Sequence, residues 1–325
     1  MNAPHPNPGS PEAPPVVVLY GGVGPEREVS LGSGPALAGA LSEAGFAVDA
    51  RDLKSTTLPR DLEDGESVVF PALHGPFGED GTLQRLLEDR RIDYAGCGPE
   101  ASHLCMHKAD TKATVAAAGV SVPDGVLFEA EAPPEAGDVV RRLGPRLVLK
   151  PEDQGSSVGL FLLEGTDALA ERLRRLDPGR WLIEPRIMGR ELSIGVLEGR
   201  GLGIVELFPV SGVYDFASKY TAGRTRYDFP ARLAPSVEEA VRSAAETAFR
   251  VCGCRDFARV DFMLPAEGPL RFLEINTLPG LTPTSLLPKS ASCLGWDFPA
   301  LAAALVAPAV RRFRARRKEV TDGPA

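Results

Sequence analysis

The sequence predicts an α/β protein that starts with a small doubly wound parallel sheet and continues as mixed α+β structure. In the first third, apolar strands run into Gly-rich loops and then into helices, which is typical of a doubly wound sheet. From about residue 98, hairpin-like strands and single helices replace that alternation. The chain has 325 residues, 43% hydrophobic and 25% charged, which suits one large core or two or three smaller ones and excludes a disordered or fibrous protein.

The N-terminal elements follow from hydrophobic pattern and turn residues. PVVVLYGG (15–22) predicts a buried strand, and the stretch to Ala44 predicts a helix that starts or bends at Pro35. SVVFPALHG (67–75) predicts a second strand, and the Asp-Gly pair beyond it opens a helix through RLLEDR (85–90). We therefore expect a flexible tail at 1–15 and a Rossmann-like domain at 16–97.

The rest of the chain divides into two further segments, a central one at 98–187 and a C-terminal one at 188–315, with a tail at 316–325. The central segment shows helical patterns at 108–119 and 167–176 and strand patterns at 120–128, 146–163 and 181–187. The C-terminal segment shows a helix at 238–253 and strands at 191–199, 201–210, 257–264 and 270–276. Because each segment has about 100 residues, each is large enough to have its own core.

Charge, cysteine content and hydropathy exclude several classes of protein. The net charge of -8 argues against a nucleic-acid partner, because duplex binding requires a basic surface. No apolar run approaches a membrane span and the first residues do not resemble a leader, so we expect a cytoplasmic protein with no membrane partner. The five cysteines form no CxxC pair and leave an odd thiol, which predicts reduced packing residues.

The stretch RFLEINTLPG (271–280) places oxygen ligands on one face of a strand. Alternation puts Glu274 and Asn276 on the same side, and a short connection to FARVDFML brings Asp261 across from Glu274. Two carboxylates and an amide without His or Cys form the set that magnesium takes together with phosphate oxygens. The alternative is that Glu274 only pairs with Arg259 or Arg271 at a sheet edge.

A second motif, LVLKPEDQGSSVGL (147–160), predicts a flexible cover for phosphate. Lys150 ends an apolar strand, and Gly155, Ser156, Ser157 and Gly159 follow in a loop whose backbone N–H groups can approach an anion closely. The spacing is not that of a Walker A motif, and GGVGPE does not match GxGxxG. The alternative is an ordinary Gly/Ser hairpin turn.

These residues carry a resemblance to a known family. LKPEDQGSSVGL, WLIEPRI with Glu191, FARVDFML and FLEINTLPGLTPTS occur in the order of the ATP-grasp fold. Together with GGVGPEREVS, HGPFGEDGTLQ and DFASKY, they resemble the D-alanine:D-alanine ligases over about residues 16–310. The resemblance implies three domains, with ATP between the central and C-terminal sheets.

The resemblance also implies a nucleotide site. Lys108 and Lys150 would contact phosphates, Glu184 and the Ile187 backbone would bind adenine, and Glu191 would hold the ribose. The remaining implied contacts are Ser156, Ser157 and Lys219 for ATP, and Asp261, Glu274 and Asn276 for two Mg²⁺ or Mn²⁺ ions. K⁺ is a further candidate cation.

In the implied reaction, one D-alanine becomes an acyl phosphate and the amine of a second D-alanine displaces the phosphate. Glu26 would bind the first ammonium within a network that includes Ser156 and Tyr220. Arg259 and the Gly280 N–H would stabilise the oxyanion. Ser285 and the Leu286 N–H, at the start of a short helix, would take the second carboxylate.

Two further segments bear on the substrates. The segment 210–230 has no clean period, and its Lys219 and Tyr220 favour a lid over a solvated loop, so both are candidate contacts. His74 is a candidate substrate contact or a core histidine bonded to Glu79.

Several alternatives stay open. HLCMH (103–107) is a possible zinc half-site or simple packing. The second substrate is D-alanine or, as the runner-up, D-serine or another D-amino acid, and a non-catalytic nucleotide-binding regulator is the remote alternative. The resemblance also implies a homodimer. Three departures from the family pattern are Gly24 in place of a common serine, His107 in the usual MDK, and DQGSSVG for EGSSVG.

Overall fold

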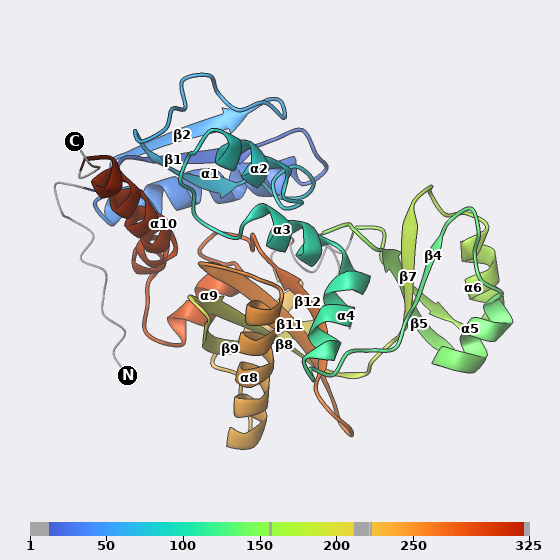
Figure 1. Ribbon diagram of the computed structural model, residues 1–325. Coiled ribbons are helices and arrows are strands. Elements are labelled where there is room, and N and C mark those ends of the chain that lie inside the picture. The colour runs from blue at the N-terminus through green and yellow to red at the C-terminus, as the bar shows by residue number, and fades with distance from the viewer. Residues whose placement is uncertain (1–12, 156–157, 211–220, 222, 322–325) are drawn as a thin grey trace.

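The computed structural model describes residues 13–155, 158–210, 221 and 223–321. Its strands form three separate sheets, each of which falls in one stretch of the chain. Figure 1 shows three corresponding lobes: the first sheet in blue, a lobe of four green and yellow-green strands on the right, and a sheet of five strands below. The chain therefore combines a parallel sheet with two antiparallel ones.

The first sheet is parallel, as predicted, with β1 (Val16–Gly21) between β2 (Val48–Leu53) and β3 (Val68–Ala72). The sequence analysis missed β2, VDARDL, because this edge strand is only partly buried and lacks a buried strand's apolar run. The helices of this part are α1 (Arg27–Glu43), which contains Pro35, and α2 (Thr82–Asp89).

The second sheet has the order β4-β7-β5-β6, and all its neighbours are antiparallel. Two of its helices, α5 (Ala136–Leu143) and α6 (Gly165–Leu173), pack on β5 (Arg146–Pro151) through a core that includes Val139, Leu147 and Leu169. The other elements of this region are α3 (Pro99–Met106), α4 (Lys108–Ala117), β4 (Val126–Glu129), β6 (Phe161–Glu164) and β7 (Arg180–Pro185). The strand expected at 120–128 is wrong in its first half, because regular pairing begins only at Val126.

The third sheet has the order β10-β9-β8-β11-β12. Its strands are β8 (Gly189–Leu197), β9 (Arg200–Pro209), β10 (Thr225–Asp228), β11 (Phe257–Pro265) and β12 (Arg271–Asn276). On one face α8 (Pro235–Val251) packs over Ile194. On the other, α9 (Leu286–Ser292) lies so close to Gly195 that an added Cβ would be 2.5 Å from Leu287. β10 corrects the expectation that 210–230 lacks regular structure, because it pairs with β9.

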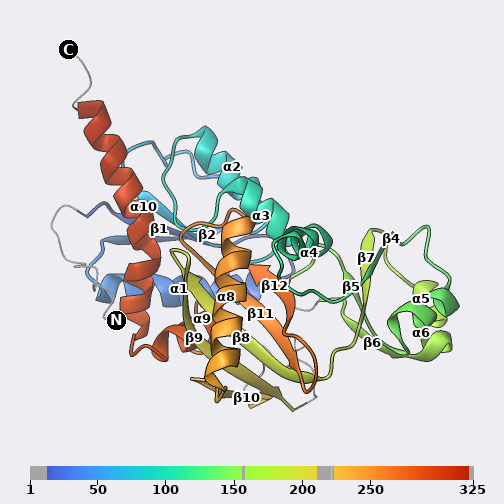
Figure 2. The same ribbon diagram turned by 60° about the horizontal axis from the view of Figure 1, so that its bottom comes forward.

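The last helix, α10 (Phe298–Thr321), returns to the first sheet, where it packs against α1 and β3. Figures 1 and 2 both show it beside the blue elements. Leu301, Leu305 and Val306 share one core with Val18 and Leu37. The tail predicted at 316–325 is wrong up to Thr321, because the helix continues there. Of the helices in the described ranges, none is long and apolar enough to cross a bilayer.

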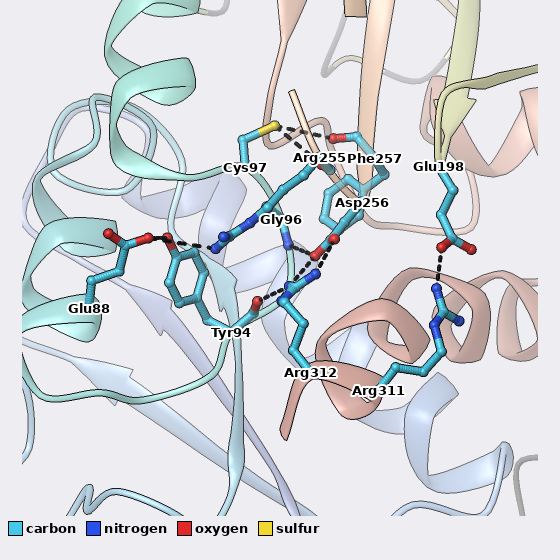
Figure 3. Close-up of polar contacts among 10 residues, drawn as sticks. All are labelled: Glu88, Tyr94, Gly96, Cys97, Glu198, Arg255, Asp256, Phe257, Arg311 and Arg312. Atoms are coloured by element: carbon cyan, nitrogen blue, oxygen red, sulfur yellow. Dashed lines mark hydrogen bonds and ion pairs between the residues drawn. The ribbon is translucent and has the colours of Figure 1, made fainter. Parts of the chain in front are cut away.

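The buried acid Asp256 joins three parts of the chain (Figure 3). Asp256 is 4% exposed and has a positive φ of 59°. Its carboxylate accepts from Arg312 of α10 at 2.6 and 2.7 Å and from the Gly96 N–H at 2.9 Å. Arg312 also donates to the Tyr94 carbonyl at 2.8 Å. This cluster, which we call the Asp256 junction, ties the end of the first sheet to β11 and α10.

Candidate active site

The oxygen ligands predicted on β11 and β12 lie together. The register places Asp261 opposite Glu274, and Arg259 opposite Asn276. Arg259 donates to Asp261 from Nε to Oδ1 at 3.0 Å and from Nη2 to Oδ2 at 2.8 Å, and Ser193 Oγ donates to Oδ1 at 2.6 Å. These partners fix an almost fully buried carboxylate on the α9 side of the sheet. Arg271, one alternative partner for Glu274, instead donates to Ser121.

A cavity of about 490 Å³ gathers most of the predicted substrate contacts. It lies where the first sheet's loops meet β12 and the start of α9. The predicted residues that line it are Glu26, His74, Lys108, Gly155, Arg259, Glu274, Asn276, Gly280, Ser285 and Leu286. The chain thus brings residues from position 26 to position 286 to one enclosed space.

Glu26 is seated between two glycines. It directly precedes α1 and is 3% exposed. A Cβ atom placed on Gly75 would lie 2.5 Å from Glu26 Oε2, and one on Gly155 would lie 3.2 Å from it. Gly75 therefore leaves no room for a side chain and also has a positive φ of 79°, whereas a side chain at Gly155 would only crowd Glu26. At Gly24, where the family often has serine, an added Cβ would meet nothing within 4 Å, so this departure is sterically neutral.

His74 is the bonded core histidine that one of the two alternatives predicts. Its Nδ1 lies 3.2 Å from Glu79 Oε1, and its Nε2 lies 3.0 Å from Ser33 Oγ. The same Ser33 Oγ accepts a long hydrogen bond of 3.4 Å from the Leu281 N–H. The ring is therefore a bonded, buried histidine that also lines the 490 Å³ cavity. A contact with substrate stays a prediction.

The opposite wall of the cavity is formed by the turn before α9. A Cβ on Gly280 would lie 2.9 Å from Ser285 Oγ, so this turn needs glycine there. Ser285 occupies the N-cap of α9, and Leu286 is the first helical residue. This is the loop entering a short helix that the sequence predicts. Free N–H groups at such a helix start favour an anion.

A second cavity of about 160 Å³ adjoins the first. Lys108, Gln154 and Glu274 line both of them. The predicted nucleotide and metal residues that line the smaller cavity are Lys108, Lys150, Glu184, Ile187, Glu191, Asp261 and Glu274. The smaller cavity lies between the second and third sheets, since its walls come from β5, β7, β8, β11 and β12.

Two members of a buried three-residue cluster, Lys150 and Glu184, line the smaller cavity. Glu184 of β7 pairs with Lys150 of β5, Oε2 to Nζ at 2.8 Å, and through Oε1 with Lys112 of α4. Burial lowers the pKa of Lys112 to about 8, although Glu184 opposes this shift. Burial alone would raise the pKa of Glu184, but the charges of Lys112 and Lys150 outweigh it and lower that pKa to about 2. The carboxylate is therefore ionised at neutral pH, and the charge of Glu274 acts on both lysines as well.

Lys108 is held against the predicted phosphate loop. Its Nζ donates to the Gln154 carbonyl at 2.6 Å. The neighbouring His107 lies with Nδ1 2.8 Å from Oε2 of the fully buried Glu152. His107 is thus engaged by an acid of the loop, and no group of three His, Cys, Asp or Glu residues within the described ranges is placed to hold a metal. The zinc interpretation of HLCMH is wrong. All five cysteines are free thiols, as predicted.

Four predicted site residues lie outside the described residues. They are Ser156, Ser157, Lys219 and Tyr220. Their roles stay predictions from the sequence.

The chain matches two family models in succession. A model described as the D-Ala D-Ala ligase N-terminus matches residues 47–97, and one described as the C-terminus matches residues 114–307. A D-alanine–D-alanine ligase of Anaeromyxobacter dehalogenans is 42% identical over 288 residues, which cover 88% of this chain and 94% of the relative. The chain belongs to the D-alanine–D-alanine ligase family.

Solved structures of this family have the same fold. D-alanine–D-alanine ligase from Bacillus anthracis, complexed with ATP, superimposes with a TM-score of 0.81 at 27% identity, covering 94% of this chain and all of that one. VanG D-Ala:D-Ser ligase from Enterococcus faecalis has a TM-score of 0.77 at 27% identity, covering 92% of this chain and all of that one. The predicted ATP-grasp fold and ligase family are confirmed.

The structure adds residues that the sequence analysis did not single out. Ser193 binds Asp261, Ser33 binds His74, and Lys112 binds Glu184. For Lys112 a signal was available, because it follows Lys108 by four residues in a helix and so lies on the same face. Ser33 and Ser193 had no such local signal, since their partners are distant in the chain.

Proposed function

We propose that this protein is an ATP-dependent ligase that joins two D-alanine molecules through a D-alanyl phosphate to give D-alanyl-D-alanine, a peptidoglycan precursor. Family membership supports the reaction. The observation that carries its location is the pair of adjoining cavities, which share Lys108 and Glu274. A phosphoryl group passing between two substrates needs such a meeting point, because the reacting atoms must be in line.

ATP would bind at the 160 Å³ cavity. Its adenine would lie at Glu184 and the Ile187 backbone, and its ribose at Glu191, all of which line that cavity. Lys108 and Lys150 would contact phosphates, together with Ser156, Ser157 and Lys219. Lys150 supports this placement, because it lines the cavity while Lys112 also pairs with Glu184, so Lys150 can serve an anionic ligand.

Asp261, Glu274 and Asn276 fit a site for two Mg²⁺ or Mn²⁺ ions. They present only oxygen ligands on adjacent strands, as hard cations require. Bound there, the ions would neutralise charge on the terminal phosphates. A K⁺ requirement is a further expectation with no support from the geometry.

In the first step, a carboxylate oxygen of one D-alanine attacks the γ-phosphorus and ADP leaves, which forms the acyl phosphate. Glu26 would hold the ammonium of this D-alanine, in a network with Ser156 and Tyr220, and His74 would lie beside it. Glu26 is suited to this because its carboxylate is buried and lines the larger cavity. Water exclusion matters here, since water would hydrolyse an acyl phosphate.

In the second step, the amine of the other D-alanine attacks the acyl carbon, the tetrahedral oxyanion forms, and phosphate leaves. Arg259 and the Gly280 N–H would stabilise that oxyanion, at about 3 kcal/mol per donor in comparable sites. Ser285 and the Leu286 N–H would hold the second carboxylate. Lys219 and Tyr220, in the lid at 210–230, would close over both substrates.

The decisive experiment measures phosphate release from ATP with and without D-alanine, together with the mass of the product. D-Alanine-dependent release and a D-alanyl-D-alanine product are expected. The absence of D-alanine-dependent release would contradict the ligase, and nucleotide binding without any phosphate release would favour the non-catalytic regulator. The Asp261→Ala, Glu274→Ala double variant should lose Mg²⁺-dependent turnover, and full turnover in that variant would refute the metal assignment.

A competition experiment would identify the second substrate. D-Alanine, D-serine and D-lactate are offered together, and the products are separated by mass. The likeness to a D-Ala:D-Ser ligase keeps D-serine as the runner-up, whereas the relatives at 42% identity are D-alanine–D-alanine ligases. A D-alanyl-D-serine product in excess would reverse the order.

We further expect a homodimer and a cytoplasmic location. The free thiols suit a reducing compartment. Light scattering on the purified protein tests the dimer, and a monomer mass would contradict it.

A further inference from the structure

The Lys112–Glu184–Lys150 cluster poses a question that the proposed reaction leaves open. Glu184 uses one carboxylate oxygen for each lysine, and all three groups are nearly buried. If Lys150 turns toward phosphate when ATP binds, Glu184 loses one of its two cations. A buried carboxylate with too little counter-charge takes up a proton.

Lys112 is placed to prevent that loss of charge. It projects from α4, whereas Lys150 and Glu184 belong to neighbouring strands of the second sheet. It is 6% exposed and is not among the described residues that line either cavity. It therefore reaches Glu184 from behind, where a bound nucleotide would not displace it.

The protonation state of Glu184 matters for the choice of purine. Adenine presents an amino donor at its six-position, and guanine presents a carbonyl oxygen there. An ionised carboxylate accepts from the first and repels the second, whereas a protonated acid can donate to the carbonyl. A site whose polar group is left mismatched rejects the wrong ligand strongly.

We propose that Lys112 is a positioning residue that keeps Glu184 ionised and in place while Lys150 contacts the phosphates, and so sets the preference for adenine over guanine nucleotides. This inference rests on the proposed function, because it takes Glu184 as the purine contact. It adds a residue that acts only through Glu184.

The test is the Lys112→Met variant, which keeps the length of the side chain and removes its charge. Dissociation constants for the non-hydrolysable imido analogues of ATP and GTP are measured by calorimetry in Mg²⁺ without D-alanine. We expect the ATP analogue to bind about 10-fold or more weakly and the GTP analogue to change less than about 3-fold. The Michaelis constant for D-alanine should stay unchanged.

Two controls separate this role from a general loss of structure. Lys54→Met removes an exposed lysine that pairs with Asp52 in the first sheet, and should leave both constants unchanged. In a Glu184→Gln background, Lys112→Met should have little further effect on the ATP analogue, because the two changes break one interaction. If Lys112→Met fails to fold, Lys112→Gln is measured in its place and judged by the same criteria.

Three results would overturn the inference: an ATP-analogue affinity within about 3-fold of the unaltered protein, equal losses for both analogues, or additive effects with Glu184→Gln. The proposed function fails separately. A protein that prefers the ATP analogue through Lys112 but shows no D-alanine-dependent phosphate release keeps the inference and loses the ligase reaction.

Discussion

Glu184 and Asp256 are both buried acids held by basic side chains, yet they differ in the number of cations bonded to them. Glu184 is bonded to two lysines, one of which lines a cavity, and Glu274 is a further acid that acts on both lysines. Asp256 has one arginine, and its other contact is a backbone N–H. A lysine that shares its acid with a second lysine and lines a cavity is available to an anionic ligand, whereas an arginine that uses both oxygens of one acid is satisfied by the fold itself. The number of bonded cations thus distinguishes the cluster that we propose for nucleotide binding from a structural junction.

The largest effect on stability should follow from breaking the Asp256 junction. Asp256→Ala leaves Arg312 and the Gly96 N–H without their acceptor and puts alanine at a positive φ. We expect the free energy of unfolding to fall by about 3 to 5 kcal/mol, measured by urea denaturation. Turnover per folded molecule should stay near its original value, because Asp256 lines neither proposed substrate cavity.

The matched control for this variant is Asp256→Asn. Asparagine tolerates the left-handed backbone and keeps an acceptor, so a smaller loss is expected. Equal losses for both variants would show that charge at Asp256 is the whole contribution.

Breaking the Lys150–Glu184 pair should instead lower turnover and leave stability almost unchanged. Lys150→Met leaves Glu184 paired with Lys112, so the fold keeps its buried pair. We expect kcat/KM for ATP to fall by about 100-fold, roughly 3 kcal/mol, while the urea midpoint changes little. A variant that unfolds readily but turns over ATP normally would remove the distinction between the two clusters.

The acid stability of the protein sharpens the comparison further. The pKa of Glu184 is lowered from 4.5 to about 2 by the two lysines, against burial, so between these values the folded state binds fewer protons than the unfolded one. The resulting stability is complete above about pH 4.5 and is lost as the pH falls toward 2, to a total of roughly 3 kcal/mol. Urea denaturation between pH 5 and 3 should show a shallower pH dependence in Glu184→Gln. Identical slopes would exclude Glu184 as a source.

The smallest effect on stability is expected at an exposed ion pair. Arg141 and Asp138 pair on α5 with most of both side chains exposed. Arg141→Ala should change the free energy of unfolding by less than about 0.5 kcal/mol, because solvent and salt screen such pairs. A loss comparable to that of Asp256→Ala would mean that burial does not govern these contacts.

Local alternation was sufficient to predict how Asp261 and Glu274 lie relative to each other in the sheet. Asp261 and Glu274 face each other because two strands joined by a short turn have a nearly fixed register. The turn into α9 was predictable for the same reason, since Ser285 and Leu286 are adjacent in sequence. Where a site is built from one hairpin or one loop, spacing along the chain fixes geometry.

Contacts between distant segments had no comparable signal. Nothing local pairs Asp256 with Arg312, which is 56 positions away, or places Lys112 against Glu184, 72 positions away. The edge strand β2 was missed because charged residues interrupt it and only Leu53 is buried, so it lacks the apolar pattern of β1. These features depend on how the sheets and helices pack, which one sequence does not state.

The return of α10 has a consequence for how the protein matures. The first sheet shares its core with Leu301, Leu305 and Phe313, so that core is incomplete until those residues are made. During synthesis from the N-terminus, the earliest segment must wait for the latest one, with apolar surface uncovered in the meantime. Because α10 follows all three sheets in the chain, it leaves the ribosome after them, and we expect this interval to be when the nascent chain most needs a chaperone.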